Sequence, residues 1–277
     1  MLPEMIAYFQ NAGYLTEVCV TEKRGDATDF AERFAGETDR IVACGGDGTL
    51  NETVTGLIRS GSRTPLGYIP CGTTNDFAAS LGLSHDLMTC CAIAAEGRTQ
   101  PIDAGLFNGT RFFTYTASFG AFTSARYTAP QNVKNVLGHA AYILEGIRSL
   151  SEIRPIHLKI DADGEQYEDD YLFGAVCNST SLGGILKLDS EEVDLNDGLF
   201  ETLLIRMPKD ILELNRILTS LAAKRYNDPM MTFIRANFYT INGGTDLKWT
   251  LDGEEADGRE NVTVKNVRDA FTIIVPE

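Results

Sequence analysis

A glycine-rich turn between an apolar run and a helical pattern constrains this chain more than any other feature. The apolar residues 41–44 stop at the sequence Gly-Gly-Asp-Gly of residues 45–48, and apolar residues then recur at helical spacing over 50–58. Such a strand, turn and helix aim backbone N–H groups and the positive end of a helix at a phosphate. Glycines allow a close approach because no Cβ intervenes. The same pattern also forms turns with a purely structural role, so both interpretations stay open at this point.

A second glycine turn follows the next expected strand, over residues 65–70. Gly72, Thr73, Asn75 and Asp76 come directly after it. Ligands of open α/β sheets bind beyond the carboxyl ends of adjacent strands, so we expect the two turns to converge on one ligand. Asp47 in the first turn would repel a phosphate unless a divalent cation lay between them, which indicates a metal–nucleotide site. Alternatively, Asn75 and Asp76 only cap the following helix.

The order of predicted elements divides the 277 residues into two parts. Helices and strands alternate in the first hundred residues, which predicts a parallel α/β domain over 1–98. After a short hinge at residues 95–101, short β-branched and aromatic segments separated by Gly, Asn and Asp predict an antiparallel β-sandwich or barrel over 99–277. Expected helices are 4–12, 27–34, 50–59, 77–81, 136–150 and 209–225; expected strands are 15–20, 41–44, 65–70, 111–117, 156–161, 171–178, 199–206, 233–241, 247–251 and 271–275.

Charge and composition narrow the function classes. The net charge of −15 disfavours nucleic acid and anionic lipid as partners of the whole surface, so any membrane contact has to be local. No apolar run approaches the roughly 20 residues that cross a bilayer, and the first residues lack the pattern of a signal peptide.

The cysteines form no CxxC pair and mostly lie in apolar runs, so we expect reduced core thiols of a cytoplasmic protein; they are Cys19, Cys44, Cys71, Cys90, Cys91 and Cys177.

Three motifs in order resemble the diacylglycerol kinase catalytic-domain family. They are the glycine turn of residues 45–52, the second turn of residues 72–77, and Leu-Asp-Gly-Glu at residues 251–254. That family includes bacterial soluble lipid kinases and the sphingosine and ceramide kinases, with NAD kinases as distant relatives. The resemblance extends from about Thr21 almost to the last residue. It implies an N-terminal nucleotide-binding domain and a C-terminal β-sandwich for the lipid, with the active site in the cleft between them.

The resemblance implies ATP and Mg²⁺ as cofactors and assigns roles to individual residues. It places Asp47, Asp76 and Asp103 around the catalytic magnesium, where Mg²⁺ favours one or two carboxylates, waters and phosphate oxygens. Asp103 could equally bind the backbone of a turn. The residues implied in nucleotide binding are Thr21, Gly45, Gly46, Asp47, Gly48, Thr49, Asn51, Glu52, Gly72, Thr73 and Asn75.

The last motif supplies the implied catalytic residues. Glu254 matches the general base of the family, which takes the proton of the acceptor hydroxyl as the phosphoryl group transfers. Asp252 and Asp47 complete the catalytic set. From the residues alone, Asp252-Gly253 is also a hairpin turn signal, and Glu254 could be a solvated strand residue.

A second, structural magnesium site of some bacterial members is implied at residues 194–199. Asp194, Asp197 and the carbonyl of Leu199 would be its ligands. The spacing suits a hard cation with oxygen ligands. It is equally compatible with an Asn-Asp-Gly turn that needs no ion.

The resemblance has one large departure at the start of the chain. Family members usually begin with a strand and an Asn-Pro-x-Ser-Gly turn that also contacts the nucleotide, whereas this sequence begins in the helix that follows. We therefore expect that this strand is absent or that the chain is shortened, which weakens the nucleotide contact. An exposed sheet edge at that place is compatible with a homodimer.

The resemblance implies a lipid kinase that phosphorylates diacylglycerol to phosphatidic acid, and we expect it to be cytoplasmic and peripheral to the inner face of the membrane. Other lipid alcohols remain open as acceptors. Basic residues near helix 209–225 could contact a membrane surface, although a helix packed on its own sheet explains them as well. Two alternatives are a catalytically weak relative that binds nucleotide or lipid as a regulatory module, and an NAD kinase-like enzyme with a soluble acceptor.

Overall fold

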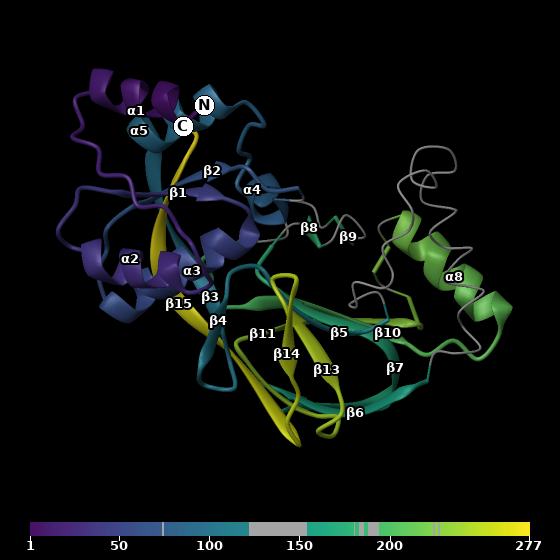
Figure 1. Cartoon of the computed structure of the whole chain (residues 1–277). Helices are drawn as coiled ribbons and strands as arrows, with labels where there is room; N and C mark the ends of the chain where they lie inside the picture. The colour runs from purple at the N-terminus through teal and green to yellow at the C-terminus, as the bar shows by residue number, and fades with distance from the viewer. Residues whose placement is uncertain are drawn as a thin grey trace.

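Two stacked regions, one with helices around a short sheet and one built of strands, make up the chain in a computed structural model (Figure 1). The structure describes residues 1–73, 75–121, 154–179, 181–182, 186–187, 194–223, 225–226 and 228–277. The helix expected at residues 136–150 lies outside these ranges.

Helices cover both faces of a parallel strand pair in the first region, as the sequence predicts. Strands β1 and β2 pair in parallel, with Ala43 opposite Tyr68. Alternate residues point to opposite faces: Ala43 and Tyr68 join a core with α2 and α3, whereas Ile69 packs with α1 and α5. Figure 1 shows these two helix pairs on opposite sides of the sheet. The elements are α1 (Leu2–Asn11), α2 (Asp26–Phe34), β1 (Ile41–Gly45), α3 (Asp47–Ser60), β2 (Leu66–Pro70), α4 (Asp76–Ser80) and α5 (Leu87–Glu96).

The strand expected at residues 15–20 is wrong. This segment has no regular structure, and its apolar side chains Leu15, Val18 and Val20 are exposed. A strand is stabilised by its ladder, and among the described strands β1 ends the sheet with β2 as its one neighbour. Residues 15–20 do not pair with the free edge of β1, so their alternating pattern forms no ladder and therefore no strand.

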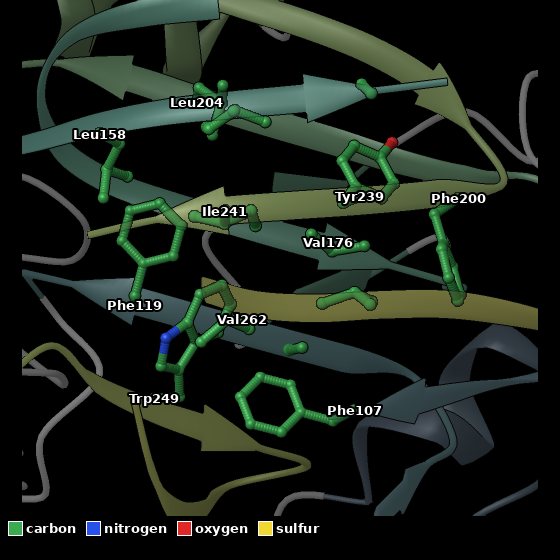
Figure 2. Close-up of a cluster of buried hydrophobic side chains, with 14 of the residues drawn as sticks. Phe107, Phe119, Leu158, Val176, Phe200, Leu204, Tyr239, Ile241, Trp249 and Val262 are labelled. Atoms are coloured by element: carbon green, nitrogen blue, oxygen red, sulfur yellow. The ribbon is translucent and has the colours of Figure 1, made fainter. Parts of the chain in front are cut away.

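The second region is antiparallel, which confirms the expected β-sandwich class. Its core gathers the rings of Phe107, Phe119 and Trp249 with aliphatic side chains from several strands (Figure 2). Trp249 lies edge-on to both phenyl rings, with centroids 5.3 Å from Phe107 and 4.9 Å from Phe119. The strands are β4 (Arg111–Phe113), β5 (Thr116–Gly120), β6 (Ile156–Ala162), β7 (Glu165–Cys177), β8 (Ser181–Leu182), β9 (Leu186–Lys187), β10 (Phe200–Arg206), β11 (Met231–Ala236), β12 (Phe238–Asn242), β13 (Lys248–Leu251) and β14 (Glu254–Asp257).

Two long strands connect the regions where a hinge was expected. Strand β3 (Arg98–Phe107) begins inside residues 95–101 and pairs antiparallel with β15 (Asn261–Val275). The end of β15 returns to the first region, where Ile273 pairs in parallel with Leu66 of β2. The end of β15 thus pairs within the sheet of the first region, although its residues belong to the expected second domain of 99–277.

Helix α8 (Ile211–Ala222) confirms the helix expected at 209–225. Asp210 caps it by accepting hydrogen bonds from the N–H groups of Leu212 and Glu213, at 2.9 Å each. Leu214 and Ile217 are buried, so the helix packs on its own sheet. Among the described residues, no helix has the length and apolar character needed to span a bilayer.

Candidate active site

The first glycine turn is the start of a helix. Helix α3 begins at Asp47, earlier than expected, with Gly46 as its N-cap. The Leu50 N–H already donates to the Gly46 carbonyl, so residues 47–49 form the first helical turn. Their N–H groups have no partner inside the helix, and the helix dipole adds positive potential there. This end of a 14-residue helix can hold an anion.

The two glycine turns touch through their backbones. A Cβ added at Gly72 would lie 2.6 Å from the Cα of Gly46, so only glycine allows this approach. The Cys71 N–H also donates to the Gly45 carbonyl, at 2.8 Å. The expected convergence of the two turns is thus a direct contact at the ends of β1 and β2.

Asn75 shapes the second turn with its own side chain. Its Oδ1 accepts from the Gly72 N–H at 3.0 Å, and its Nδ2 donates to the Gly72 carbonyl at 2.8 Å. Its φ of 50° lies in the left-handed region that asparagine tolerates better than most residues. These contacts give Asn75 a structural role, and a nucleotide contact of Asn75 stays a prediction.

Asp47 and Asp76 form a pair of half-buried carboxylates beside these turns. Asp47 Oδ2 accepts from the Asp76 N–H at 3.2 Å, whereas its buried Oδ1 accepts no hydrogen bond from the described part of the chain. Burial raises the pKa of Asp47. Burial and the nearby Asp47 charge raise the pKa of Asp76. A free buried oxygen and two mutually repelling carboxylates are a donor set that fits a divalent cation.

Asp252 holds the hairpin of β13 and β14 against α3. Its carboxylate accepts from the Thr114 N–H at 2.6 Å, the Thr114 Oγ1 at 2.7 Å, and the N–H groups of Tyr115 and Thr116 at 3.0 Å each. Asn51 of α3 donates a further bond at 2.8 Å. Burial raises the pKa of Asp252, and the three backbone donors oppose the rise. With all these donors, Asp252 positions the hairpin; direct participation in catalysis stays a prediction.

The hairpin turn brings Glu254 over the glycine turn. Asp252 and Gly253 both have positive φ, the geometry of a tight two-residue hairpin, so the turn interpretation of these residues is confirmed. Glu254 Oε1 lies 3.9 Å from where a Cβ of Gly48 would be. Its Oε2 accepts from the guanidinium groups of Arg24 and Arg111. The half-exposed Glu254 is therefore tied to both regions of the chain.

Arg24 and Arg111 were not singled out from the sequence. Arg24 lies between Thr21 and Gly25 in a segment that the resemblance already covered, so its positive charge was a signal from which it could have been predicted as a site residue. Arg111 follows a turn with no local signal, and its link to Glu254 spans 143 residues of sequence. Only the folded chain brings the two guanidinium groups to one carboxylate.

Two of the other implied nucleotide residues, Thr49 and Glu52, have contacts around the first turn and α3. Glu52 Oε1 accepts from the Gly25 N–H at 2.9 Å, and its carbonyl accepts from Thr28 Oγ1 at 2.9 Å, which fixes the segment before α2 on α3. The Thr49 side chain packs against Gly45. Thr21 and Thr73 are exposed.

Asp103 is fully buried in β3. Its carboxylate accepts from the Gly198 N–H at 2.7 Å and the Asp269 N–H at 2.9 Å. Burial raises its pKa, and these donors oppose the rise. The structure thus gives it the turn-binding role that the sequence left open. Across the described ranges, no group of three or more His, Cys, Asp or Glu side chains is arranged to hold a metal ion.

The turn at residues 194–199 does not fit the implied second cation. Asp197 accepts from the Leu199 N–H at 2.9 Å and from the Arg235 guanidinium. The Leu199 carbonyl accepts from Asn266, and Asp194 accepts from the Asn196 N–H. Each expected ligand thus already accepts a hydrogen bond, and the positive charge of Arg235 beside them opposes a cation at this turn.

The cysteines are all free, as expected, but only half of them lie in the core. Cys90, Cys91 and Cys177 are buried, whereas Cys19, Cys44 and Cys71 are exposed. The Cys44 and Cys71 sulfurs lie 3.5 Å apart beside the glycine turns. The expectation that the cysteines are core residues is wrong for the exposed three, because the strand ends that carry two of them open toward the site.

Comparison with known proteins identifies the class of protein that carries this site. The profile of the diacylglycerol kinase catalytic domain matches residues 1–107, and that of the YegS C-terminal NAD kinase beta sandwich-like domain matches residues 117–275. A diacylglycerol kinase of Bacillus subtilis (strain 168) is 36% identical, over 91% of this chain and 84% of the relative. One of Staphylococcus aureus (strain JH9) is 35% identical, over 91% of this chain and 80% of the relative.

The chain is thus a kinase, a phosphotransferase with an alcohol acceptor. It belongs to the bacterial diacylglycerol kinase family with the NAD kinase-like C-terminal domain. The same fold occurs in a solved structure of a putative diacylglycerol kinase from Bacillus anthracis str. Sterne, with a TM-score of 0.80 and 24% identity over 99% of this chain and 92% of that chain.

Proposed function

We propose that this chain transfers the γ-phosphate of ATP to the hydroxyl of a membrane lipid, with diacylglycerol as the acceptor and phosphatidic acid as the product. The observation that carries the proposal is the position of Glu254. Its Oε1 faces Gly48 in the first turn of α3, so a carboxylate lies beside the helix N-terminus that can hold an anion. The relatives that match nearly the whole chain bear the name diacylglycerol kinase, which supports the choice of acceptor.

In this proposal the glycine turns bind the phosphates of ATP. The N–H groups at the start of α3 point at the phosphates, and Gly48, where an added Cβ would meet nothing closer than Glu254 Oε1 at 3.9 Å, leaves room for them. Asp47 and Asp76 would hold a Mg²⁺ ion between protein and phosphate, and Mg²⁺ supplies neutralisation of phosphate charge. Because Asp47 Oδ2 already accepts from the Asp76 N–H, the free Oδ1 is the oxygen that would bind Mg²⁺.

Glu254 acts as the general base. As the lipid oxygen forms its bond to the γ-phosphorus, the bond to the bridging oxygen breaks and ADP leaves with that electron pair. The hydroxyl proton passes to the Glu254 carboxylate. Asp252 positions this side chain through Asn51 of α3 and the backbone of residues 114–116.

The lipid reaches the site by peripheral contact of the protein with the inner face of the membrane. Helix α8 exposes Leu212, while its neighbour Arg216 pairs with Asp228 at 3.0 Å. The basic side chains that could bind anionic lipid are thus partly neutralised within the protein. We therefore propose a weak, reversible contact that relies on apolar side chains more than on charge.

The test is transfer of labelled γ-phosphate from ATP and Mg²⁺ to a panel of lipid alcohols in mixed micelles. The panel contains diacylglycerol, phosphatidylglycerol, a sphingoid base and a polyprenol. Glu254→Gln removes the base, and Glu255→Gln, the neighbouring carboxylate on the same strand, is the matched control. We expect labelled phosphatidic acid from the wild type and Glu255→Gln, and none from Glu254→Gln. Nucleotide binding without transfer to any of these lipids would overturn the proposal and favour a regulatory relative.

A further inference from the structure

Two guanidinium groups meet at one oxygen of Glu254. Arg24 and Arg111 both donate to Oε2, while Oε1 faces the glycine turn. Both donors are Nη2 atoms, and they come from distant parts of the chain. Arg24 belongs to the segment before α2, and Arg111 begins β4.

The two arginines are held very differently. Arg111 Nη2 lies 2.9 Å from Glu254, and its Nη1 donates to the Glu255 carbonyl at 2.8 Å, so both ends of the guanidinium are bound to the same hairpin. Its side chain is 33% exposed. The Arg24 side chain is 71% exposed and crosses from the first region to Glu254. Arg111 is therefore fixed relative to Glu254, and Arg24 is free to exchange its partner.

The backbone that carries Arg24 is anchored to the glycine turn. The Gly25 N–H donates to Glu52 of α3 at 2.9 Å, and Asp26 accepts from the N–H groups of Glu22 and Lys23 at 2.8 and 2.9 Å. This keeps the base of the Arg24 side chain at a constant place beside α3. The guanidinium lies on one oxygen of Glu254 while the other oxygen faces Gly48, so a rotation of the side chain is enough to bring it over Gly48.

The charge of the site requires a cation at that place. Asp47 and Asp76 are acidic, Arg111 stays paired with Glu254 and does not offset them, and the chain as a whole carries −15. The terminal phosphate of a bound triphosphate would lie among these carboxylates, where a single divalent ion leaves most of the negative charge uncompensated. A guanidinium binds phosphate through two parallel N–H bonds and cannot lose its charge.

We propose that Arg24 exchanges partners during turnover. It holds Glu254 in the nucleotide-free protein and binds the terminal phosphate once a triphosphate enters, whereas Arg111 stays on Glu254 as a positioning residue. The exchange makes and breaks only hydrogen bonds. It also frees part of Oε2 at the moment when the acceptor hydroxyl needs a proton acceptor. The proposal rests on the phosphoryl-transfer function proposed above and names the residue that senses the phosphate to be transferred.

The experiment compares binding of ADP with binding of a non-hydrolysable ATP analogue, by calorimetry at fixed Mg²⁺. The variants are Arg24→Gln, Arg24→Lys and Lys23→Gln, the last being the matched control from the same exposed segment. Loss of a charge-assisted bond to the terminal phosphate lowers triphosphate affinity about tenfold or more. We expect that loss in Arg24→Gln, a partial loss in Arg24→Lys, and unchanged ADP affinity in both. Lys23→Gln should match the wild type with both ligands.

Equal changes for ADP and the analogue in Arg24→Gln, or no change for either, would overturn the proposal. A wild type that binds neither nucleotide would instead overturn the proposed transfer from ATP, so the two failures are distinguishable. Arg111→Gln separates the roles further: as a positioning residue it should keep both affinities and KM for ATP while kcat falls about tenfold. If Arg111→Gln weakens the analogue selectively, the assignment of the two arginines is reversed and the proposal fails.

Discussion

Two pairs of aspartates, the half-buried Asp47 with Asp76 and the buried Asp252 with Asp103, differ in what their oxygens contact. Burial raises the pKa of all four carboxyls, so pKa does not distinguish the pairs. Backbone and side-chain donors surround Asp252 and Asp103. Asp47 keeps one buried oxygen without a partner among the described residues. Satisfied carboxylates hold a fold together, and an unsatisfied one beside a glycine turn marks a binding site.

The largest effect is expected for the satisfied pair. Asp252→Asn replaces one acceptor oxygen by a donor, which then faces either the N–H groups of Tyr115 and Thr116 at Oδ1 or the N–H group of Thr114 at Oδ2. Each unpaired buried group costs about 1–3 kcal/mol, so the free energy of unfolding should fall by about 3 kcal/mol or more. Asp103→Asn should act in the same direction through Gly198 and Asp269. Urea unfolding measures both, and unchanged midpoints would remove the distinction between the pairs.

Glu201 tests whether a free buried oxygen is enough to mark a site. It pairs with Arg235, its Oε2 has no partner in the described ranges, and burial raises its pKa from 4.5 to about 7. Because the folded state binds this proton more tightly, the contribution to stability is full below about pH 4.5 and is lost as pH rises through about 7.

We expect Glu201→Gln to remove that pH dependence and leave phosphoryl transfer unchanged. The wild type should lose up to about 1.4 kcal/mol of stability per pH unit within this window relative to the variant. Urea midpoints at about pH 5 and about pH 8 measure the difference, with Glu260→Gln as an exposed control. A loss of transfer in Glu201→Gln would show that the free oxygen belongs to the function after all.

Gly72→Ala tests the contact between the two glycine turns. The new Cβ would lie 2.6 Å from the Gly46 Cα and 2.7 Å from Asn75 Oδ1, so the turns have to separate. We expect about 1–3 kcal/mol of lost stability. Nucleotide affinity should fall about tenfold or more, because the backbone N–H groups of the two turns would no longer converge on the same phosphates. Calorimetry with ADP measures the affinity, and unchanged affinity would show that the turns bind independently.

Gly48→Ala should lower nucleotide affinity while changing stability less than the preceding variants do. Gly48 lies within the first turn of α3, and its nearest neighbour for a Cβ is Glu254 Oε1 at 3.9 Å, so alanine fits. Alanine in a helix is favoured over glycine by about 0.5–1 kcal/mol, and the melting temperature should rise slightly. The methyl group would occupy the proposed phosphate space and lower nucleotide affinity. A more stable variant with normal affinity would place the phosphate elsewhere.

The sequence predicts the local parts of this site and misses the parts that depend on distant contacts. The turns at Gly46 and Gly72 and the hairpin at Asp252 follow from short patterns with a defined backbone geometry. The contacts of Arg24 and Arg111 with Glu254 join residues 230 and 143 positions apart, and no local pattern encodes them.

The errors in the predicted fold have the same origin. Residues 15–20 alternate like a strand, but a strand needs a neighbour, and a single-segment pattern does not contain it. Strand β15 was expected only over its last residues, because its register with β3 shifts between Val267 and Phe271 and interrupts the pattern. The sequence alone also does not show that the end of this strand pairs with β2, because the partner strand lies far away in the sequence.

The measurement that tests the central claim most directly compares stability and phosphoryl transfer in Asp47→Asn, with the exposed Asp29→Asn as control. Burial raises the pKa of Asp47, so a neutral side chain should keep or raise the melting temperature at neutral pH. Transfer of labelled phosphate from ATP to diacylglycerol should fall at least about 100-fold, because the proposed Mg²⁺ contact is lost. Asp29→Asn should change neither quantity. Normal transfer by a folded Asp47→Asn, or loss of the fold itself, would contradict the assignment of this aspartate to the active site.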